Sequence, residues 1–267
     1  MRIFSLVMVL LFPFVVAAEL VVDDIKFNNQ AVPVKLLVYT QKQPAPTIII
    51  SHGSSCVPPR KLQWADRVEA WGYNAVVIDH CIKRGVKAHP ASDLPRILQV
   101  EDRIKDYVAV ADWVKKQPFN KGKIGLIGFS RGGEGILGML NESYYVGKTG
   151  FPAGYSKTID AAVAYYPSCL LGDKELRDSS IPLLVNFGEK DALTPSINCA
   201  FYKEGSAGKI ANLKVETYPG AHHGFEINLP DQWAPTPRGN VLVLSYNAKQ
   251  AERSFENTKA FFDKNLK

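Results

Sequence analysis

The chain has 267 residues, of which 46% are hydrophobic and 22% are charged, and its formal net charge is +6. This composition excludes an intrinsically disordered chain and supplies enough apolar residues for a sizeable core, and α/β folds of roughly 200–250 residues commonly form a single domain. The basic residues are scattered and no nucleic-acid motif accompanies them, so the charge indicates a solvated basic surface and no nucleic-acid partner.

The first residues have the pattern of a secretory signal peptide. Arg2 precedes an apolar run over residues 3–16, and Ala18 supplies the small residue of a cleavage site. The run is too short to span a bilayer comfortably, which favours a cleaved signal over an uncleaved anchor. We therefore expect residues 1–18 to be a signal peptide and residues 19–267 to form one domain. The protein would be periplasmic or secreted, with no stable membrane span after cleavage.

Short β-branched runs alternate with longer stretches of helical period along the rest of the chain. This alternation is typical of a mostly parallel sheet with helices on both faces, so we expect an α/β fold with a twisted sheet of about seven to eight strands. The predicted strands are Lys35–Tyr39, Thr47–Ser51, Ala75–Asp79, Lys123–Phe129, Ala161–Tyr166, Leu183–Phe187 and Lys214–Tyr218. The predicted helices are Leu62–Trp71, Ile97–Lys116 and a final helix from an Asn247 cap to about Asn265.

The four cysteines lie at or soon after the ends of predicted strands: Cys56, Cys81, Cys169 and Cys199. An even number in an exported chain, without a C-x-x-C pair, favours disulfides over metal ligation. Three pairings are open from the sequence, and four buried free thiols are the alternative. The positions beyond strand ends favour Cys56–Cys81 and Cys169–Cys199.

The stretch KIGLIGFSRGGEG places Ser130 at a turn between a predicted strand and a helical pattern. Gly128 and Gly132 lie two residues before and after it, where small residues let strand and helix pass closely around a strained nucleophile. The Arg131 N–H, at the helix N-terminus, is a candidate donor to an oxyanion formed at this serine. A glycine-rich phosphate loop is disfavoured because neither of its glycine spacings is present.

A serine nucleophile needs a base and an orienting carboxylate, which follow it in the order Asp or Glu, then His, in α/β-hydrolases. Asp191 follows a strand in LLVNFGEKDALTP, and His223 follows the next strand in TYPGAHHGF. Both lie on the same sheet edge as the serine. Asp191, before Thr-Pro, could instead be a turn residue or helix cap. Glu189 is the alternative acid and His222 the alternative base.

The second oxyanion donor should come from the loop after an earlier strand. The stretch TIIISHGSSC ends such a strand, and its Gly53 allows a close approach, so the Ser54 backbone N–H is the candidate. We expect His52 to brace this loop and not to act as a second base. Asp79 and His80 are adjacent on a strand and point to opposite faces, so they should not pair with each other.

These motifs resemble the dienelactone hydrolase family of the α/β-hydrolase superfamily. The resemblance runs from about Pro33 to the C-terminus through IIISHGSSC, GYNAVVID, IGLIGFSRGG, AAVAYYPSC, LLVNFGEKDALTP, TYPGAHHGF and YNAKQAERSFENTKAFF. It implies that the histidine before Gly-Phe, His223, is the base, that Asp191 is the acid, and that Ser54 gives an oxyanion amide.

The namesake enzymes of the family use a cysteine nucleophile, whereas this chain has Ser130, as many exported relatives do. Because a hydroxyl needs different activation from a thiol, the resemblance leaves the substrate open. The cysteines after the two later strands resemble the disulfide of similar exported members, which supports Cys169–Cys199 more than Cys56–Cys81.

We therefore expect a serine hydrolase that cleaves ester or lactone bonds of small substrates through a Ser-His-Asp triad and an acyl-enzyme. One alternative is a peptidase similar to prolyl oligopeptidases, but these usually carry a β-propeller, and only about 15 residues separate the expected cleavage site from the first strand. The other is a non-catalytic binding protein on a hydrolase scaffold, against which the intact Ser, Asp, His order argues. No cofactor or metal motif occurs, since His222 and His223 are adjacent and have no carboxylate cluster beside them.

Overall fold

The computed structural model describes residues 25–57, 62–86, 98–146, 150–169, 179–196, 213–235 and 241–267. The expected signal peptide, residues 1–18, lies outside the described residues.

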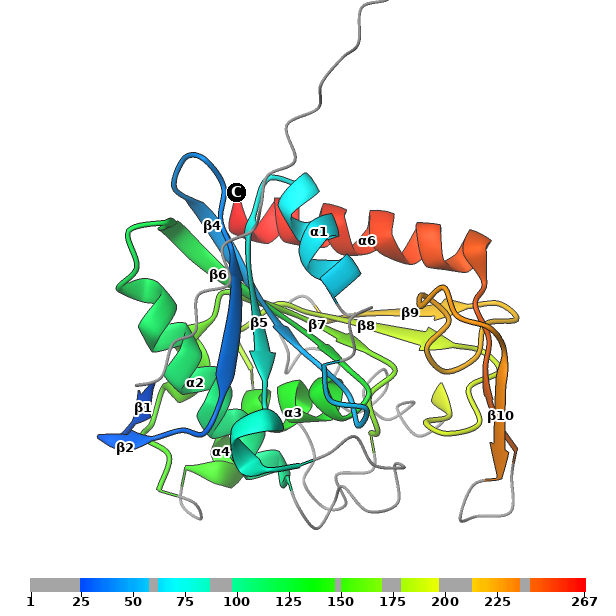
Figure 1. Ribbon diagram of the computed structural model, residues 1–267, viewed down its shortest axis with the longest axis horizontal. Helices are drawn as coiled ribbons and strands as arrows, with labels where there is room; N and C mark the ends of the chain where they lie inside the picture. The colour runs from blue at the N-terminus through cyan, green and yellow to red at the C-terminus, as the bar shows by residue number, and fades with distance from the viewer. Residues whose placement is uncertain are drawn as a thin grey trace, which may run out of the picture.

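A seven-stranded sheet in the order β3-β5-β4-β6-β7-β8-β9 forms the centre of the molecule (Figure 1). Its strands are β3 (Lys35–Tyr39), β4 (Ala45–Ser51), β5 (Asn74–Asp79), β6 (Asn120–Phe129), β7 (Ala161–Tyr165), β8 (Leu183–Gly188) and β9 (Leu213–Tyr218). β3 runs antiparallel to β5, and the other neighbours are parallel. The predicted α/β fold is confirmed, and every predicted strand is present.

Two small hairpins stand apart from this sheet, and sequence analysis did not predict them. They are β1 (Lys26–Phe27) with β2 (Gln30–Ala31), and β10 (Gln232–Pro235) with β11 (Val241–Leu244). Their strands are two to four residues long, too short to produce a clear alternation in the sequence.

Helices cover both faces of the sheet (Figure 1). On one face, α1 (Leu62–Ala70) packs on β4 and β5, and α6 (Ala248–Leu266) packs on β6 to β8. On the other, α2 (Val100–Lys115) and α3 (Arg131–Leu140) pack against each other and on β6. The described residues also form short helical turns: η2 (Ile82–Arg84), α4 (Glu142–Tyr145) and η4 (Tyr155–Thr158). The Asn247 side chain accepts the Gln250 N–H at 3.2 Å, so the predicted cap of the last helix is confirmed.

The inner strands are buried on both sides, which explains their continuous apolar runs. All of β7 and β8 is buried, and Trp64 of α1 contacts the rings of Phe129, Tyr165 and Phe255 on one side of the sheet. In the parallel register Ser51 pairs with Gly128, and Phe129 with Tyr165, so these strands end at a common edge. The loops that carry the predicted site residues therefore collect at that edge.

Among the described residues, no helix combines the length and apolar character needed to cross a bilayer.

Candidate active site

Ser130 occupies the sharp turn between β6 and α3. Its backbone angles are φ 52° and ψ −114°, a conformation that residues with a side chain rarely adopt. Its N–H donates to the Tyr165 carbonyl at 2.9 Å, and its own carbonyl accepts the Glu134 N–H at 2.9 Å. Hydrogen bonds on both sides thus hold a strained backbone in place, as is common at functional sites.

The glycines around Ser130 permit this turn. A Cβ at Gly128 would lie 2.5 Å from the backbone carbon and oxygen of Gly132, and a Cβ at Gly132 would lie 2.7 Å from the Ser51 carbonyl oxygen. The predicted role of both glycines, close passage of strand and helix, is confirmed. A Cβ at Gly53 would lie 3.2 Å from the Ser130 Cβ, so the loop after β4 lies directly beside the serine.

The two candidate oxyanion donors belong to segments that lie next to Ser130. Ser54 follows Gly53 in the loop after β4, and Arg131 is the first residue of α3. The first N–H groups of a helix have no intrahelical acceptor, so the Arg131 amide is available to a negative charge at this end.

Asp191 and His223 form a buried pair. The Oδ2 atom of Asp191 lies 2.8 Å from His223 Nδ1. Its Oδ1 accepts the backbone N–H groups of Leu193 and Thr194 at 2.9 and 2.8 Å, and the Thr194 hydroxyl donates to Oδ2 at 2.8 Å. One oxygen therefore accepts the N–H groups of a turn, so the turn interpretation of Asp191 is confirmed. The other oxygen is hydrogen-bonded to His223, which is the contact that a triad acid needs.

The environment of Asp191 favours its ionised form. Burial alone would raise the pKa of its carboxyl, but the interaction with His223 and the hydrogen bonds from Thr194 outweigh burial, and the pKa is lowered from its ordinary value. An ionised carboxylate accepts the proton on Nδ1 and leaves the lone pair on Nε2. This is the tautomer that a general base for a hydroxyl requires.

Tyr166 links the histidine to the serine turn. Its ring centroid lies 4.3 Å from that of His223, and its hydroxyl donates to Glu226 Oε1 at 2.7 Å. Its backbone has a positive φ of 37°, and its carbonyl oxygen lies 3.0 Å from the Thr194 hydroxyl oxygen. The preceding Tyr165 accepts the Ser130 N–H. Sequence analysis did not find these contacts; the one local signal was the three-residue spacing from Asp191 to Thr194, typical of a capping turn.

The alternative acid, Glu189, is not the partner of His223. Glu189 is exposed and accepts the Gly220 N–H at 2.8 Å, so it serves a turn and not the histidine. His222 is half-buried, next to the buried His223. In the part of the chain that the structure describes, the acid and base are hydrogen-bonded, whereas no side-chain hydrogen bond joins Ser130 to His223.

A second Ser-His-Asp arrangement lies beneath the turn. His80 Nε2 is 3.0 Å from Ser51 Oγ, and its Nδ1 is 2.6 Å from Asp106 Oδ2. All three side chains are fully buried, so no substrate reaches them. Burial lowers the pKa of His80 well below its ordinary value and raises that of Asp106 to about 6, against the attraction of Arg84. The Tyr107 hydroxyl continues the network from Ser51, at 2.7 Å, to the Gly132 carbonyl, at 2.9 Å, and thereby supports the turn.

A disulfide joins Cys56, in the loop after β4, to Cys81, just beyond β5, with a Cα–Cα distance of 5.9 Å. The predicted pairing of these two cysteines is confirmed. Cys169 is buried and disulfide-bonded, but Cys199 lies outside the described residues, so the Cys169–Cys199 pairing stays a prediction.

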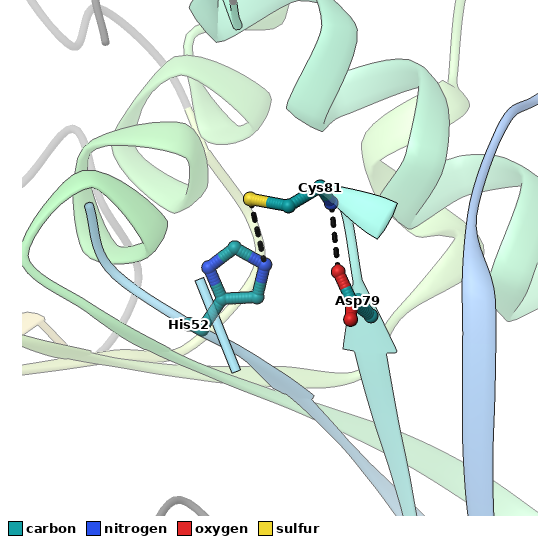
Figure 2. Close-up of side chains that lie close together, drawn as sticks. All are labelled: His52, Asp79 and Cys81. Atoms are coloured by element: carbon teal, nitrogen blue, oxygen red, sulfur yellow. Dashed lines mark hydrogen bonds between the residues drawn. The ribbon is translucent and has the colours of Figure 1, made fainter. Parts of the chain in front are cut away.

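His52, Asp79 and Cys81 place metal-ligand atoms within 4.8 Å of one another (Figure 2). Their chemistry does not fit a metal ion. The Cys81 sulfur is in the disulfide, the Cys81 N–H donates to Asp79 Oδ1 at 2.8 Å, and His52 Nε2 accepts the His80 N–H at 3.1 Å. The predicted bracing role of His52 is confirmed, and Asp79 and His80 take different partners, as expected.

The sheet order, the strained serine turn and the Asp–His pair at the carboxyl edge define an α/β-hydrolase. The family model of the dienelactone hydrolase family matches residues 34–266, and the chain belongs to this family. It is therefore a carboxylic ester hydrolase that acts on ester or lactone bonds.

Known proteins agree with this assignment. Carboxymethylenebutenolidase from Pseudomonas putida is 26% identical over 200 residues, which cover 69% of this chain and 76% of that protein. A putative dienelactone hydrolase from Klebsiella pneumoniae has a similar fold, with a TM-score of 0.68, 20% identity and coverage of 90% of this chain and 96% of that one. The propionate-bound esterase 2 of Thermogutta terrifontis also has a similar fold, with a TM-score of 0.65, 14% identity and coverage of 92% of this chain and 94% of that one.

Proposed function

We propose that this protein is an exported serine hydrolase that cleaves esters or lactones of small molecules with Ser130, His223 and Asp191. The observation that carries the proposal is the buried 2.8 Å hydrogen bond between Asp191 Oδ2 and His223 Nδ1, at the sheet edge where Ser130 is held in a strained turn. In hydrolases of this class, the distance between the serine hydroxyl and the histidine nitrogen is often longer than a hydrogen bond before substrate binds.

The proposed reaction has two steps. His223 Nε2 takes the proton of the Ser130 hydroxyl as the oxygen attacks the substrate carbonyl, and Asp191 stabilises the imidazolium. The backbone N–H groups of Ser54 and Arg131 stabilise the tetrahedral oxyanion. The imidazolium then protonates the leaving alcohol, and an acyl-serine remains. Water, deprotonated by the same imidazole, releases the acid and restores the hydroxyl.

The name of the Pseudomonas relative denotes a lactone substrate, a carboxymethylene butenolide. Lactones and short acyl esters present the same carbonyl to the nucleophile, so both belong in the first screen. No described feature of the site selects between them.

The first experiment measures hydrolysis of p-nitrophenyl acetate and butyrate by the wild-type protein and Ser130→Ala. We expect kcat to fall by at least about 10³-fold in the variant without loss of thermal stability. Ser55→Ala, an exposed serine in the loop after β4, is the matched control and should keep wild-type kcat. A folded Ser130→Ala variant that keeps more than about a tenth of wild-type turnover would refute the assignment.

Two companion measurements test the remaining parts of the proposal. Dipeptide amides should turn over far more slowly than the short esters; the reverse order would favour the peptidase alternative.

Expression of the full chain in a Gram-negative host should give periplasmic protein whose N-terminus is Glu19. Cytoplasmic protein that retains residues 1–18 would contradict export.

A further inference from the structure

Arg103 of α2 lies directly beneath the loop that carries the Ser54 amide. The side chain is buried, with 3% of the residue exposed. Its Nη1 donates to the His52 carbonyl at 3.0 Å and to Ser51 Oγ at 3.4 Å, and its Nη2 donates to the Gly53 carbonyl at 3.4 Å. One guanidinium therefore reaches two successive carbonyls of this loop.

The Gly53 carbonyl has a second donor. His52 Nδ1 lies 2.7 Å from it. Because the His80 N–H donates to His52 Nε2 at 3.1 Å, the ring proton must be on Nδ1, and Nδ1 is the donor. Two side chains from different elements thus fix the direction of this carbonyl.

The direction of the Gly53 carbonyl determines that of the Ser54 N–H. The two groups belong to one planar trans peptide, so they point in opposite directions. A peptide held by its carbonyl on the interior side presents its N–H on the other side. Gly53 itself lies against Ser130, since a Cβ on this glycine would be 3.2 Å from the Ser130 Cβ. Arg103 and His52 therefore control how the Ser54 amide faces the site.

The charge of Arg103 adds to this effect. An arginine stays protonated inside proteins, and among the described residues no carboxylate forms an ion pair with it. The neighbouring Asp106 is bound by both Arg84 nitrogens, at 2.9 Å, and by His80. Asp106 still attracts Arg103 electrostatically, but the hydrogen bonds of the guanidinium go to the loop, so its positive charge lies against the Gly53–Ser54 peptide in an interior where charges are poorly screened.

We propose that Arg103 is a positioning residue of the oxyanion hole: with His52, it orients the Gly53–Ser54 peptide so that the Ser54 N–H meets the transition state. Arg103 does not touch the substrate. The inference rests on the proposed function, because it assumes a tetrahedral oxyanion at Ser130.

The test compares Arg103→Met with Arg84→Met as a matched control. Both changes remove a guanidinium from the buried network, but Arg84 contacts Asp106 and the carbonyls of Pro33 and His80, not the loop after β4. The readouts are kcat and KM for p-nitrophenyl butyrate, melting temperature, and inhibition by an alkyl trifluoromethyl ketone, which forms a tetrahedral oxyanion with a serine. The ketone separates the two roles, because its affinity depends on the oxyanion donors.

For Arg103→Met we expect kcat to fall by about 10- to 100-fold with KM changed by less than about threefold, and the ketone to bind more weakly by the same factor as kcat/KM. Arg84→Met should keep kcat within about threefold even where it lowers the melting temperature as much. A folded Arg103→Met protein with wild-type kcat and ketone affinity would overturn the inference.

If Arg103→Met does not fold, Arg103→Lys carries the test. Lysine keeps the charge but presents a single point donor that cannot hold both carbonyls in the forked geometry, so we expect kcat and ketone affinity to fall together by about tenfold. Wild-type values for both in this variant would overturn the inference. Ser130→Ala in the same assay separates the two proposals: if it retains turnover, the proposed function fails; if it loses turnover while Arg103 variants do not, only the positioning role fails.

Discussion

Replacement of Gly128 by alanine should damage catalysis more than stability. The added Cβ would lie 2.5 Å from the carbon and oxygen of Gly132 and 2.9 Å from the nitrogen of Gly133, all of them backbone atoms. Ordinary contact begins at 3.4 Å, so strand and helix must separate by about 0.9 Å (3.4 minus 2.5). Because Ser130 lies between Gly128 and Gly132, the movement displaces the nucleophile itself.

The size of the effect follows from that displacement. A misplacement of about 1 Å can cost roughly 10²-fold in rate, and overpacking typically costs about 1–3 kcal/mol of stability. We therefore expect Gly128→Ala to fold with a lowered melting temperature and with kcat for p-nitrophenyl acetate reduced by about 10- to 100-fold.

Gly125→Ala is the matched control on the same strand. Its Cβ would meet Phe262 Cε1 at 2.8 Å and Leu266 Cδ1 at 2.9 Å, which are the ends of side chains on α6, on the opposite face of the sheet. Side-chain movement relieves this clash, so we expect a comparable loss of stability with kcat within about twofold of wild type. If both variants fold and have the same kcat, the reasoning about the serine turn is refuted.

Three further predictions concern other contacts. Thr194→Val removes the hydroxyl that donates to Asp191 Oδ2, and we expect stability to fall by about 1–2 kcal/mol and kcat by about tenfold; unchanged kcat would show that this hydroxyl does not orient the acid. Replacing Cys56 and Cys81 by serine should lower the free energy of unfolding by about 3–4 kcal/mol on the loop-entropy model, measured by urea titration, and an unchanged midpoint would contradict that role. Burial opposes ionisation of Asp263, but hydrogen bonds from two lysines and a tyrosine lower its pKa to about 2, below the unfolded value of about 3.9. Its stabilising contribution is therefore complete above about pH 4 and lost as pH falls towards 2, so Asp263→Asn should flatten the loss of stability in that window, and equal pH slopes for variant and wild type would contradict the assignment.

Local patterns made much of the fold predictable. Strand ends were found within three residues, because apolar runs of the inner strands stop where burial stops. Asn247 was recognised as a cap because a polar residue precedes an amphipathic stretch. The turn at Ser130 was predictable for a related reason: Gly128 and Gly132 are fixed by a backbone approach that tolerates no Cβ.

The supporting contacts of the site could not be predicted in this way. Arg103 and His52 meet because the fold brings α2 to the loop after β4, and residues 51 positions apart leave no spacing signal. His80 and Asp106 pair for the same reason, 26 positions apart. Tyr166 contacts His223 because two strand ends share one edge, and sequence order alone does not say which side chain turns towards the imidazole.

The most direct test of the account is the site of covalent modification. Folded protein treated with a fluorophosphonate should lose esterase activity in step with labelling, and peptide mapping by mass spectrometry should place one adduct on Ser130. His223→Gln should label far more slowly, because the hydroxyl then has no base. An adduct on another residue that tracks the loss of activity, or full activity after Ser130 is labelled, would contradict the proposal that this serine is the nucleophile.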